Sequence, residues 1–303
     1  MQIYIGGFSI RVFQISKDTP FCEMEGGTTV LDIKSDTSLF NTNASVIIAD
    51  PFLFKKEDTL FLFYEHLHKW YGTGSICMRS TKDLINWSEE TEVLVEPFHL
   101  SFPYVFEDNG KVYMLPETGG DKSIRLYEAK DDTLTKWKLV KKLKEGEEPW
   151  YDSVIYKKDD KYYLFTGHDD NIEQVQHLYV ADNLTGPYTE HPQSPIARGR
   201  DCGRNAGSII EQDGNIYRPV QVCMNYYGEQ TSIMNIEQLT PTEYKETIYR
   251  KDIIDTTQKP YKEGGHQWNY VEFLGNRIVA TDYGVKNYNL VELFRRIKKK
   301  IAK

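Results

Sequence analysis

The sequence predicts an all-β fold, a five-bladed β-propeller, and three observations lead to it. A unit of two short apolar strands joined by a polar turn recurs at intervals of roughly 50 residues, which is the period of a propeller blade. Its turns carry residues that suit tight hairpins, as at 108–110 and 213–214, because Asn and Gly tolerate positive φ. Further short strands follow the units, so that about four strands are expected per blade.

The copies of this unit align with one another residue by residue. The first three span 50–65, 102–117 and 152–167, the fourth runs from 205 to 221, and a weaker fifth runs from 266 to 282. Later strands at 75–80 and 123–129 are followed by Trp87 and Trp137 in similar places. A two-sheet sandwich is the alternative fold, but the shared register of the copies favours the ring.

The two ends of the chain have separate expected roles. Strands at 2–5 and 9–15 are expected to complete the fifth blade, so that residues 1–286 form the propeller. Residues 287–303 are expected to form a short, basic amphipathic helix, whose apolar stripe consists of Leu290, Leu293, Phe294, Ile297 and Ile301. Such a helix either docks on an anionic membrane surface or packs on the propeller edge, and the sequence leaves both open.

The bulk composition narrows the classes of partner. The net charge of the 303 residues is −8, which argues against nucleic acid because binding it requires a basic face. The N-terminus lacks the basic and apolar regions of a secretory signal, and no apolar run approaches the roughly 20 residues of a membrane span. We therefore expect a cytoplasmic protein with reduced cysteines, held peripherally at the inner face of the membrane if its tail docks there.

Metal-binding motifs are weak in this sequence. None of the four cysteines forms a C-x-x-C pair, so their spacing argues against zinc. His66 and His68 share a face of an expected strand, but no third ligand is evident beside them. The sequence requires no cofactor, and it leaves a divalent metal on the axis open.

Equivalent positions in the copies should face one axis, because the first strand of each blade lines the central channel. One column of such positions holds Asp50, Phe102, Asp152, Ala206 and Gln267, with Asn205 and His266 one residue before it. A second column holds Glu65, Glu117, Gly167, Gln221 and Asp282. Burying an unpaired carboxylate beside apolar strands costs free energy. A sequence that keeps several acids at such positions is expected to need them for function, so the clustering indicates a functional site. The alternative is that these acids bond backbone amides and hold the strands in place.

Glycosyl transfer suits such a cluster. It needs one group to protonate or stabilise the leaving oxygen and another to activate the nucleophile, and paired carboxylates do this in most glycosidases, roughly 6.5–9.5 Å apart in inverting ones. The candidate catalytic residues are Asp50, Asp152 and His266. The candidate substrate-binding residues are Glu65, Glu117, Arg204, Asn205, Gln221, Tyr104, Trp268 and Asp282.

Two of these assignments have specific alternatives. Arg204, with Arg200, lies in a Gly-rich segment that either supplies cations for a donor phosphate or is an ordinary loop between blades. His266 follows two glycines, and it is a proton carrier, a metal ligand or a packed core histidine.

Several motifs now carry a resemblance to known families. The Ala49-Asp50-Pro51 segment resembles the first-blade motif of glycoside hydrolase family 43, within the 43/32-like propellers, in which the matching aspartate is the general base. A wider set resembles the N-terminal propeller domain of plant glucosamine inositolphosphorylceramide transferases and related bacterial surface-glycan proteins, roughly from Asp50 to Tyr283. That set comprises 63–65, 102–104, 113–117, 191–195, 204–207 and 217–221.

One departure from the hydrolase pattern matters. The second aspartate of family 43 is replaced here by Phe102, and the general-acid glutamate motif of that family is not evident near Asp152. The resemblance therefore favours transfer over the ordinary three-carboxylate hydrolase.

The leading hypothesis is a glycosyltransferase-like enzyme of surface-polysaccharide or glycolipid assembly, acting on a carbohydrate or sugar nucleotide with a lipid-linked acceptor. Asp50 is then the base toward the acceptor, Asp152 and His266 orient it or stabilise charge, and Arg204 holds donor phosphate. The alternatives are a family 43-like glycoside hydrolase and a non-catalytic glycan-binding propeller.

Overall fold

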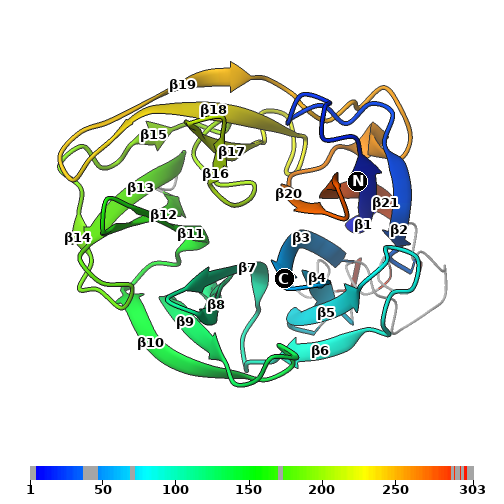
Figure 1. Cartoon of the computed structure of the whole chain (residues 1–303), viewed down its shortest axis with the longest axis horizontal. Helices are drawn as coiled ribbons and strands as arrows, with labels where there is room; N and C mark the ends of the chain where they lie inside the picture. The colour runs from blue at the N-terminus through cyan, green and yellow to red at the C-terminus, as the bar shows by residue number, and fades with distance from the viewer. Residues whose placement is uncertain are drawn as a thin grey trace.

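The computed structural model describes residues 5–36, 47–68, 72–169 and 173–287, together with 290, 294, 297 and 298. Its strands form five blades that surround a central axis, with the first strand of each blade innermost (Figure 1). A parallel pairing of Phe8 with Ile47 joins two of the blades into one eight-stranded sheet. The predicted all-β, five-bladed propeller is confirmed. Because hydrogen bonding runs outward within each blade, residues at the start of the inner strands come together on the axis.

The first three blades follow one another along the chain. Blade 1 comprises β3 (Ile47–Lys56), β4 (Thr59–Leu67), β5 (Ser75–Thr81) and β6 (Thr91–Leu94). Blade 2 comprises β7 (Ser101–Asp108), β8 (Lys111–Glu117), β9 (Ser123–Ala129) and β10 (Trp137–Glu145), with the short helix η1 (Gly119–Asp121) between β8 and β9. Blade 3 comprises β11 (Tyr151–Lys158), β12 (Lys161–Asp169), β13 (Gln174–Ala181) and β14 (Thr189–Glu190), and β15 (Ala197–Arg198) also pairs with β13.

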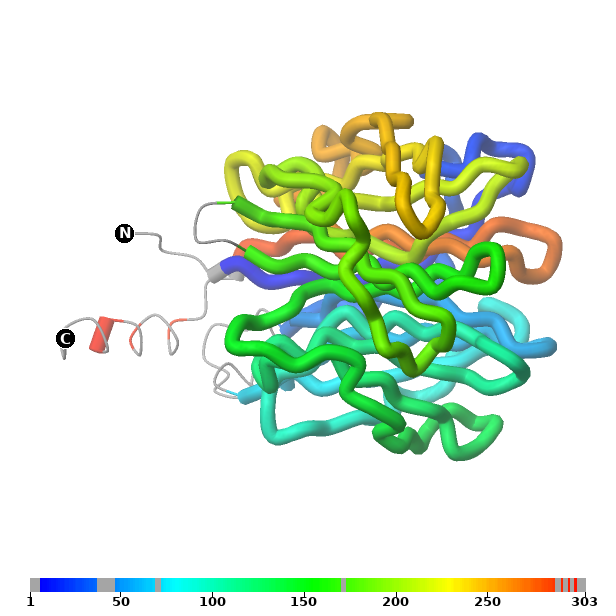
Figure 2. The backbone as a smooth tube through the Cα atoms, turned by 90° about the vertical axis from the view of Figure 1, so that its left-hand side faces the viewer, coloured from blue at the N-terminus to red at the C-terminus, as the bar shows by residue number. Residues whose placement is uncertain are grey.

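Blade 5 joins the two ends of the chain. Blade 4 precedes it and comprises β16 (Ile210–Gln212), β17 (Asn215–Val222), β18 (Gln230–Leu239) and β19 (Tyr244–Arg250), followed by η2 (Tyr261–Glu263). Blade 5 comprises β20 (Trp268–Phe273), β21 (Asn276–Asn287), β1 (Ile5–Ile15) and β2 (Thr28–Ile33). Strands β1 and β21 pair antiparallel along their whole length and run side by side in Figure 2.

The N-terminal segment completes the fifth blade as expected, but in a different form. One long strand, β1, stands where two strands at 2–5 and 9–15 were predicted, and residues 2–4 lie outside the described part. The outermost strand of the blade is β2, which the sequence analysis missed. Its side chains are exposed or half-buried, so it lacks the apolar pattern by which inner strands are recognised.

The hydrophobic core is divided among the contacts between neighbouring blades. Blades 1 and 2 pack through a cluster that includes Phe63 and Trp137, whose ring centroids are 6.0 Å apart at 79°. Similar clusters join blade 5 to blade 1 and blade 4 to blade 5, while the largest spans blades 2, 3 and 4. Each blade is thus stabilised by its neighbours rather than by a centre of its own.

The predicted C-terminal helix over 287–303 falls almost entirely outside the described residues and stays a prediction. Within the described ranges, no helix is long and apolar enough to cross a membrane.

Candidate active site on the propeller axis

A cavity of about 240 Å³ lies among the inner strands, and all five blades contribute to its wall. The lining residues are Phe8, Ile47, Ala49, Asp50, Glu65, His99, Ser101, Glu117, Tyr151, Asp152, Arg204, Tyr227 and His266. Six of them were predicted from the sequence, namely Asp50, Asp152, His266, Glu65, Glu117 and Arg204. The two columns of equivalent positions therefore meet as the repeat alignment requires.

A repeated backbone distortion aims the first column at the axis. Asp50, Phe102 and Asp152 have φ values of 52°, 46° and 46°, and each lies where the register of the first two strands of its blade shifts. A β-bulge of this kind redirects a side chain, and a left-handed conformation costs a non-glycine residue roughly 1–3 kcal/mol. Blades 1, 2 and 3 thus use one local geometry to present different side chains.

In blade 2 the equivalent position is occupied by Phe102, which packs in the core and has no reactive group. Phe102 is fully buried, and its ring lies edge-on to that of Phe52 with centroids 4.8 Å apart. Its backbone N–H donates to Oδ2 of Asp50 at 3.1 Å. Phe102 therefore supports the neighbouring acid rather than supplying one.

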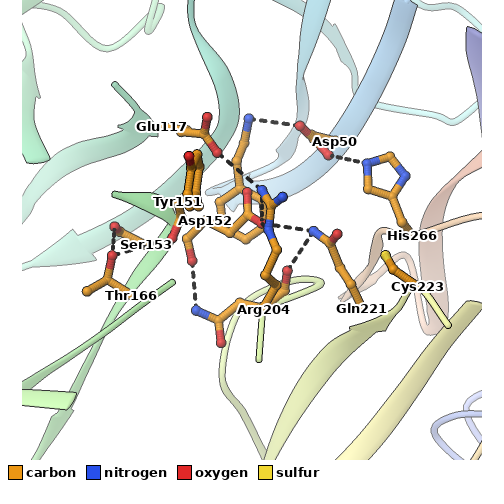
Figure 3. Close-up of polar contacts among 12 residues, drawn as sticks. Asp50, Glu117, Tyr151, Asp152, Ser153, Thr166, Arg204, Gln221, Cys223 and His266 are labelled. Carbon is orange, nitrogen blue, oxygen red and sulfur yellow. Dashed lines mark hydrogen bonds and ion pairs between the residues drawn. The ribbon is translucent and has the colours of Figure 1, made fainter. Parts of the chain in front are cut away.

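Near blade 5, an imidazole lies between two carboxyl groups. Nε2 of His266 is 3.2 Å from Oδ1 of Asp50, and Nδ1 is 3.0 Å from Oδ2 of Asp282 (Figure 3 shows the Asp50 contact). Oδ1 of Asp282 also accepts the backbone N–H groups of His266 and Gln267, at 2.8 and 3.1 Å. Burial opposes the charged ring, but Asp282 and then Asp50 outweigh it and hold the pKa of His266 well above its ordinary value. We call Asp50, His266 and Asp282 the histidine triad.

On the other side of the cavity, a guanidinium lies between two carboxyl groups. Nε and Nη2 of Arg204 both lie 2.7 Å from Oδ2 of Asp152, and Nη2 is 3.5 Å from Oε2 of Glu117 (Figure 3). The guanidinium also lies over the rings of Tyr151 and Tyr227, 4.9 and 5.7 Å from their centroids. We call Asp152, Arg204 and Glu117 the arginine triad. Because Arg204 is engaged inside the protein, the structure argues against the expected role of holding donor phosphate.

Within the arginine triad, Glu117 is the carboxyl group that resists ionisation more, as the causes of the two pKa shifts indicate. Burial raises the pKa of both carboxyl groups, and the neighbouring Asp152 charge raises that of Glu117 further, well above its ordinary value. Asp152 receives the closer contacts with Arg204, which oppose its protonation. A carboxylic acid kept neutral at the wall of a cavity is a candidate proton donor.

Three predicted binding residues lie behind the wall. Nδ2 of Asn205 donates to the backbone carbonyl of Asp152 at 2.7 Å, and Nε2 of Gln221 donates to its Oδ2 at 2.9 Å. Asp282 contacts His266 from the side away from Asp50. All three are buried, so they position catalytic candidates rather than contact a substrate.

Two predicted binding residues must be reassigned to the core. The Tyr104 hydroxyl donates to the backbone carbonyl of Ile155 at 2.7 Å, and its ring belongs to the cluster between blades 2 and 3. Trp268 is fully buried in the cluster between blades 4 and 5. Neither side chain reaches the cavity, so we no longer expect them to bind substrate.

The structure adds three residues that the sequence analysis missed. His99 accepts the backbone N–H of Gly74 on Nδ1 at 2.9 Å, which leaves Nε2 as the donor 3.1 Å from Oε1 of Glu65. Burial raises the pKa of that Glu65 carboxyl. Tyr151 precedes the blade 3 bulge, and Tyr227 lies 48% exposed on the loop between β17 and β18. His99 and Tyr227 occupy loops, where the repeat offers no signal.

The histidine triad also bears on the axial metal that the sequence left open. One atom from each of Asp50, His266 and Asp282 lies within 4.8 Å of the others. The two ring nitrogens, however, face different carboxyl groups, so an ion held by the imidazole would displace one of them. The structure therefore leaves the question of an axial metal as the sequence left it.

Comparison with known proteins points to one family. The family model described as glucosamine inositolphosphorylceramide transferase 1, N-terminal, matches residues 30–274. A protein of that name from Oryza sativa subsp. japonica is 34% identical over 236 residues, covering 76% of this chain and 31% of the rice protein. Its namesake from Arabidopsis thaliana is 32% identical over 234 residues, covering 75% of this chain and 30% of that protein. The chain thus spans about a third of the length of these relatives.

Solved structures share the fold at low identity. A thermostable family-43 glycoside hydrolase superposes with a TM-score of 0.57 at 15% identity, covering 79% of this chain and 89% of that one. The α-L-arabinofuranosidase PaAbf62A from Podospora anserina gives a TM-score of 0.59 at 10% identity, covering 80% and 91%. At these identities the similarity concerns architecture alone.

Proposed function

The chain belongs to the family of the N-terminal domain of glucosamine inositolphosphorylceramide transferase 1, and from this we propose that its axial cavity serves glycosyl transfer in glycolipid or surface-polysaccharide assembly. One observation carries the proposal. Two triads of two carboxyl groups each, one built around His266 and the other around Arg204, contribute to the wall of one cavity. Glu117, whose pKa is held well above its ordinary value, and Asp50, which accepts the Phe102 N–H and contacts the His266 ring, line the same space.

The proposed roles follow from the proton positions. Glu117 protonates the leaving oxygen, since burial and Asp152 keep its carboxyl neutral. Asp50 takes the proton of the incoming hydroxyl, because its oxygens receive the Phe102 N–H and the His266 ring. Before this transfer His266 balances the negative charge of Asp50, and Asp282 holds the ring. Arg204 keeps Asp152 ionised and so keeps the proton on Glu117.

The size of the cavity indicates what enters it. Sites for drug-sized ligands enclose roughly 300–1,000 Å³. A volume of about 240 Å³ therefore suits a sugar ring or a polar headgroup rather than a lipid chain. Following the names of the relatives, we propose a glucosaminyl donor and an inositolphosphorylceramide acceptor whose ceramide stays outside.

We place this activity at the cytoplasmic face of a membrane. Support comes from the run Arg295, Arg296, Lys298, Lys299 and Lys300 near the end of the sequence, which suits anionic lipid. An acceptor with a lipid anchor would then reach the cavity from the same surface.

Hydrolysis is the second candidate, and a specific observation favours it. The cation that would neutralise a donor phosphate, Arg204, is already paired with Asp152, whereas an acid and a base are both present. With water as nucleophile, the same two groups would cleave a glycoside.

A three-armed assay tests the proposal. The purified protein is incubated with labelled glucosaminyl nucleotides and inositolphosphorylceramide vesicles, with aryl glycosides alone, and with glycans for equilibrium binding. Labelled glycolipid that disappears in Asp50→Asn and Glu117→Gln supports transfer. Release of free sugar, lost in the same variants, replaces transfer with hydrolysis. Glycan binding that survives Asp50→Asn and Asp152→Asn without turnover overturns both enzymatic roles.

A further inference from the structure

A second cluster of chemically active side chains lies in blade 1, outside the axial cavity. His66 comes from β4, His68 lies directly after that strand, Cys77 comes from β5, and Glu90 lies just before β6. Successive residues of a strand point to opposite faces, so Glu65 faces the cavity while its neighbour His66 faces away from it. One atom from each of the four residues lies within 4.8 Å of all the others.

The distances converge on one point among the four side chains. Sγ of Cys77 lies 4.0 Å from Nδ1 of His66 and 3.7 Å from Nε2 of His68. Oε1 of Glu90 lies 3.0 Å from Nδ1 of His66. Tetrahedral zinc, with bonds of about 2.0–2.3 Å, places its sulfur and nitrogen ligands about 3.5 Å apart, so shifts of a few tenths of an ångström would close the set.

The thiol is crowded by both imidazoles. A thiol donates one proton and accepts only weakly, and Sγ of Cys77 faces a ring nitrogen of each histidine. The two imidazoles overlap, with centroids 3.8 Å apart at 31°, so protonating both would bring two cations into contact. A shared divalent cation satisfies both nitrogens and the sulfur at once.

The surroundings support the ligand orientation. The Tyr64 hydroxyl donates to Oε2 of Glu90 at 2.7 Å, which holds the carboxylate with Oε1 directed at His66. Glu92, fixed by the Ser75 hydroxyl at 2.6 Å, lies 3.4 Å from Nε2 of His68. Tyr64 is an outer partner of the kind that orients metal ligands in known sites, whereas Glu92 faces the ligating nitrogen itself and would yield it to the ion.

We propose that His66, His68, Cys77 and Glu90 form a structural zinc site. Two imidazoles, one thiolate and one carboxylate are the donors that zinc prefers among divalent cations, and four protein ligands leave no open position for catalysis. Cys77 and Tyr64 belong to the cluster that packs blade 1 against blade 5, so the ion would clamp β4, β5 and the start of β6 at that contact. The site does not depend on the function proposed for the cavity.

The sequence could not show this site because its ligands are brought together by strand register. His66 lies near the end of β4 and His68 directly follows that strand, while Cys77 on β5 pairs with Tyr64 of β4. The absence of a C-x-x-C pair, which argued against zinc, does not bear on ligands supplied by three successive strands.

Cobalt and zinc titration of the chelator-treated protein tests the proposal. We expect one cobalt ion per chain with a tetrahedral spectrum and a sulfur-to-cobalt charge-transfer band, and zinc should displace it and raise Tm. His68→Gln should weaken zinc binding by at least about tenfold. The His68 side chain is 41% exposed, so this variant keeps the fold, whereas Cys77→Ser replaces a fully buried residue and serves to remove the charge-transfer band.

Cys202→Ser is the matched control. Cys202 is a partly exposed cysteine between β15 and β16, and its Sγ contacts the backbone carbonyl of Arg198 rather than a histidine. This variant should leave the band, the stoichiometry and the affinity unchanged. Failure of the wild-type protein to bind cobalt, or a band that persists in Cys77→Ser, overturns the proposal. Equal zinc affinity of His68→Gln and the wild-type protein does so as well.

Discussion

The two triads of the axial cavity have the same outline and different chemistry. In each, a cationic side chain lies between two carboxyl groups, with His266 between Asp50 and Asp282 and Arg204 between Asp152 and Glu117. An imidazole can release its proton, whereas a guanidinium in a protein cannot. The cation at the centre of the arginine triad is therefore permanent, while the one at the centre of the histidine triad can be lost during a reaction.

The comparison assigns a task to each side of the cavity. Arg204 holds Asp152 ionised, and its neighbour Glu117 stays neutral because burial and that negative charge act together. His266 carries its charge because two acids outweigh its burial. Acid and base roles are separated in just this way when two environments push the pKa values of titratable groups apart.

The largest expected effect comes from removing the proton held by Glu117. Glu117→Gln should lower turnover in the transfer or hydrolysis assay by about 10²- to 10⁴-fold, because the amide keeps the shape and lacks a transferable proton. Glycan binding should persist. Glu107→Gln changes an exposed acid of the same blade and should behave as wild type. An infrared band of a protonated carboxyl group at neutral pH that is absent from Glu117→Gln checks the assignment without any substrate.

The next largest effect is a loss of stability when the arginine triad loses its cation. Arg204→Met should lower the free energy of unfolding by about 3–5 kcal/mol in urea denaturation, since it leaves Asp152 buried without its cation. Lys161→Met removes an exposed partner of Asp182 and should cost less than about 1 kcal/mol. Equal losses in the two variants would mean that Arg204 does not stabilise its acids. Adding Asp152→Asn to Arg204→Met should recover part of the loss.

A pH series sharpens the contrast on the histidine side. The raised pKa of His266 means that the folded protein holds this proton more tightly than the unfolded chain does. Its contribution to stability is therefore full below about pH 6.5, the ordinary histidine value, and declines as pH rises toward the folded pKa. The slope should approach −1.4 kcal/mol per pH unit at about pH 7–8, and His266→Gln should flatten it.

His177 provides the control for this series. Burial lowers the pKa of His177, although Glu190 opposes this. The contribution of His177 to stability therefore increases with pH, so His177→Gln cannot flatten the decrease in stability above about pH 6.5. If His266→Gln leaves the measured slope unchanged, the ring is not charged in the folded protein.

The smallest effect concerns the aromatic cover shared by the two triads. The Tyr227 ring lies 5.0 Å from the His266 ring and beside the Arg204 guanidinium. Tyr227→Ala should weaken glycan binding by about two- to tenfold, and Tyr227→Phe should retain most of it. Tyr226→Ala removes an adjacent ring of similar exposure that does not line the cavity. Equal losses for Tyr226→Ala and Tyr227→Ala, measured by calorimetry, would rule out a specific contact.

Much of the fold was predictable because the repeat has a register. Aligning the copies placed Asp50, Phe102 and Asp152 in equivalent positions, and the structure gives all three the same left-handed backbone. Strand β2 was not predicted, because its side chains are exposed or half-buried and therefore show no regular alternation of apolar residues.

The site was predictable in position and not in detail. The repeat alignment identified Glu117 and Gln221 as equivalent, but only the packing shows that the first reaches the cavity and the second lies behind Asp152. Tyr104 and Trp268 were chosen as aromatic residues close to the columns, and their side chains turn into the contacts between blades. Tyr227 comes from a loop outside any repeated pattern.

The pairing of β1 with β21 has a consequence for how the molecule acquires its shape. Blades 1 to 4 are contiguous in the sequence, so each can pair its strands and pack on the preceding blade as the chain leaves the ribosome. The last blade has to wait for the final strand, and meanwhile β1 presents an open edge to other chains. We expect the late pairing of β1 with β21 to limit the folding rate, and a chaperone that covers the open edge of β1 to accelerate folding most at this step.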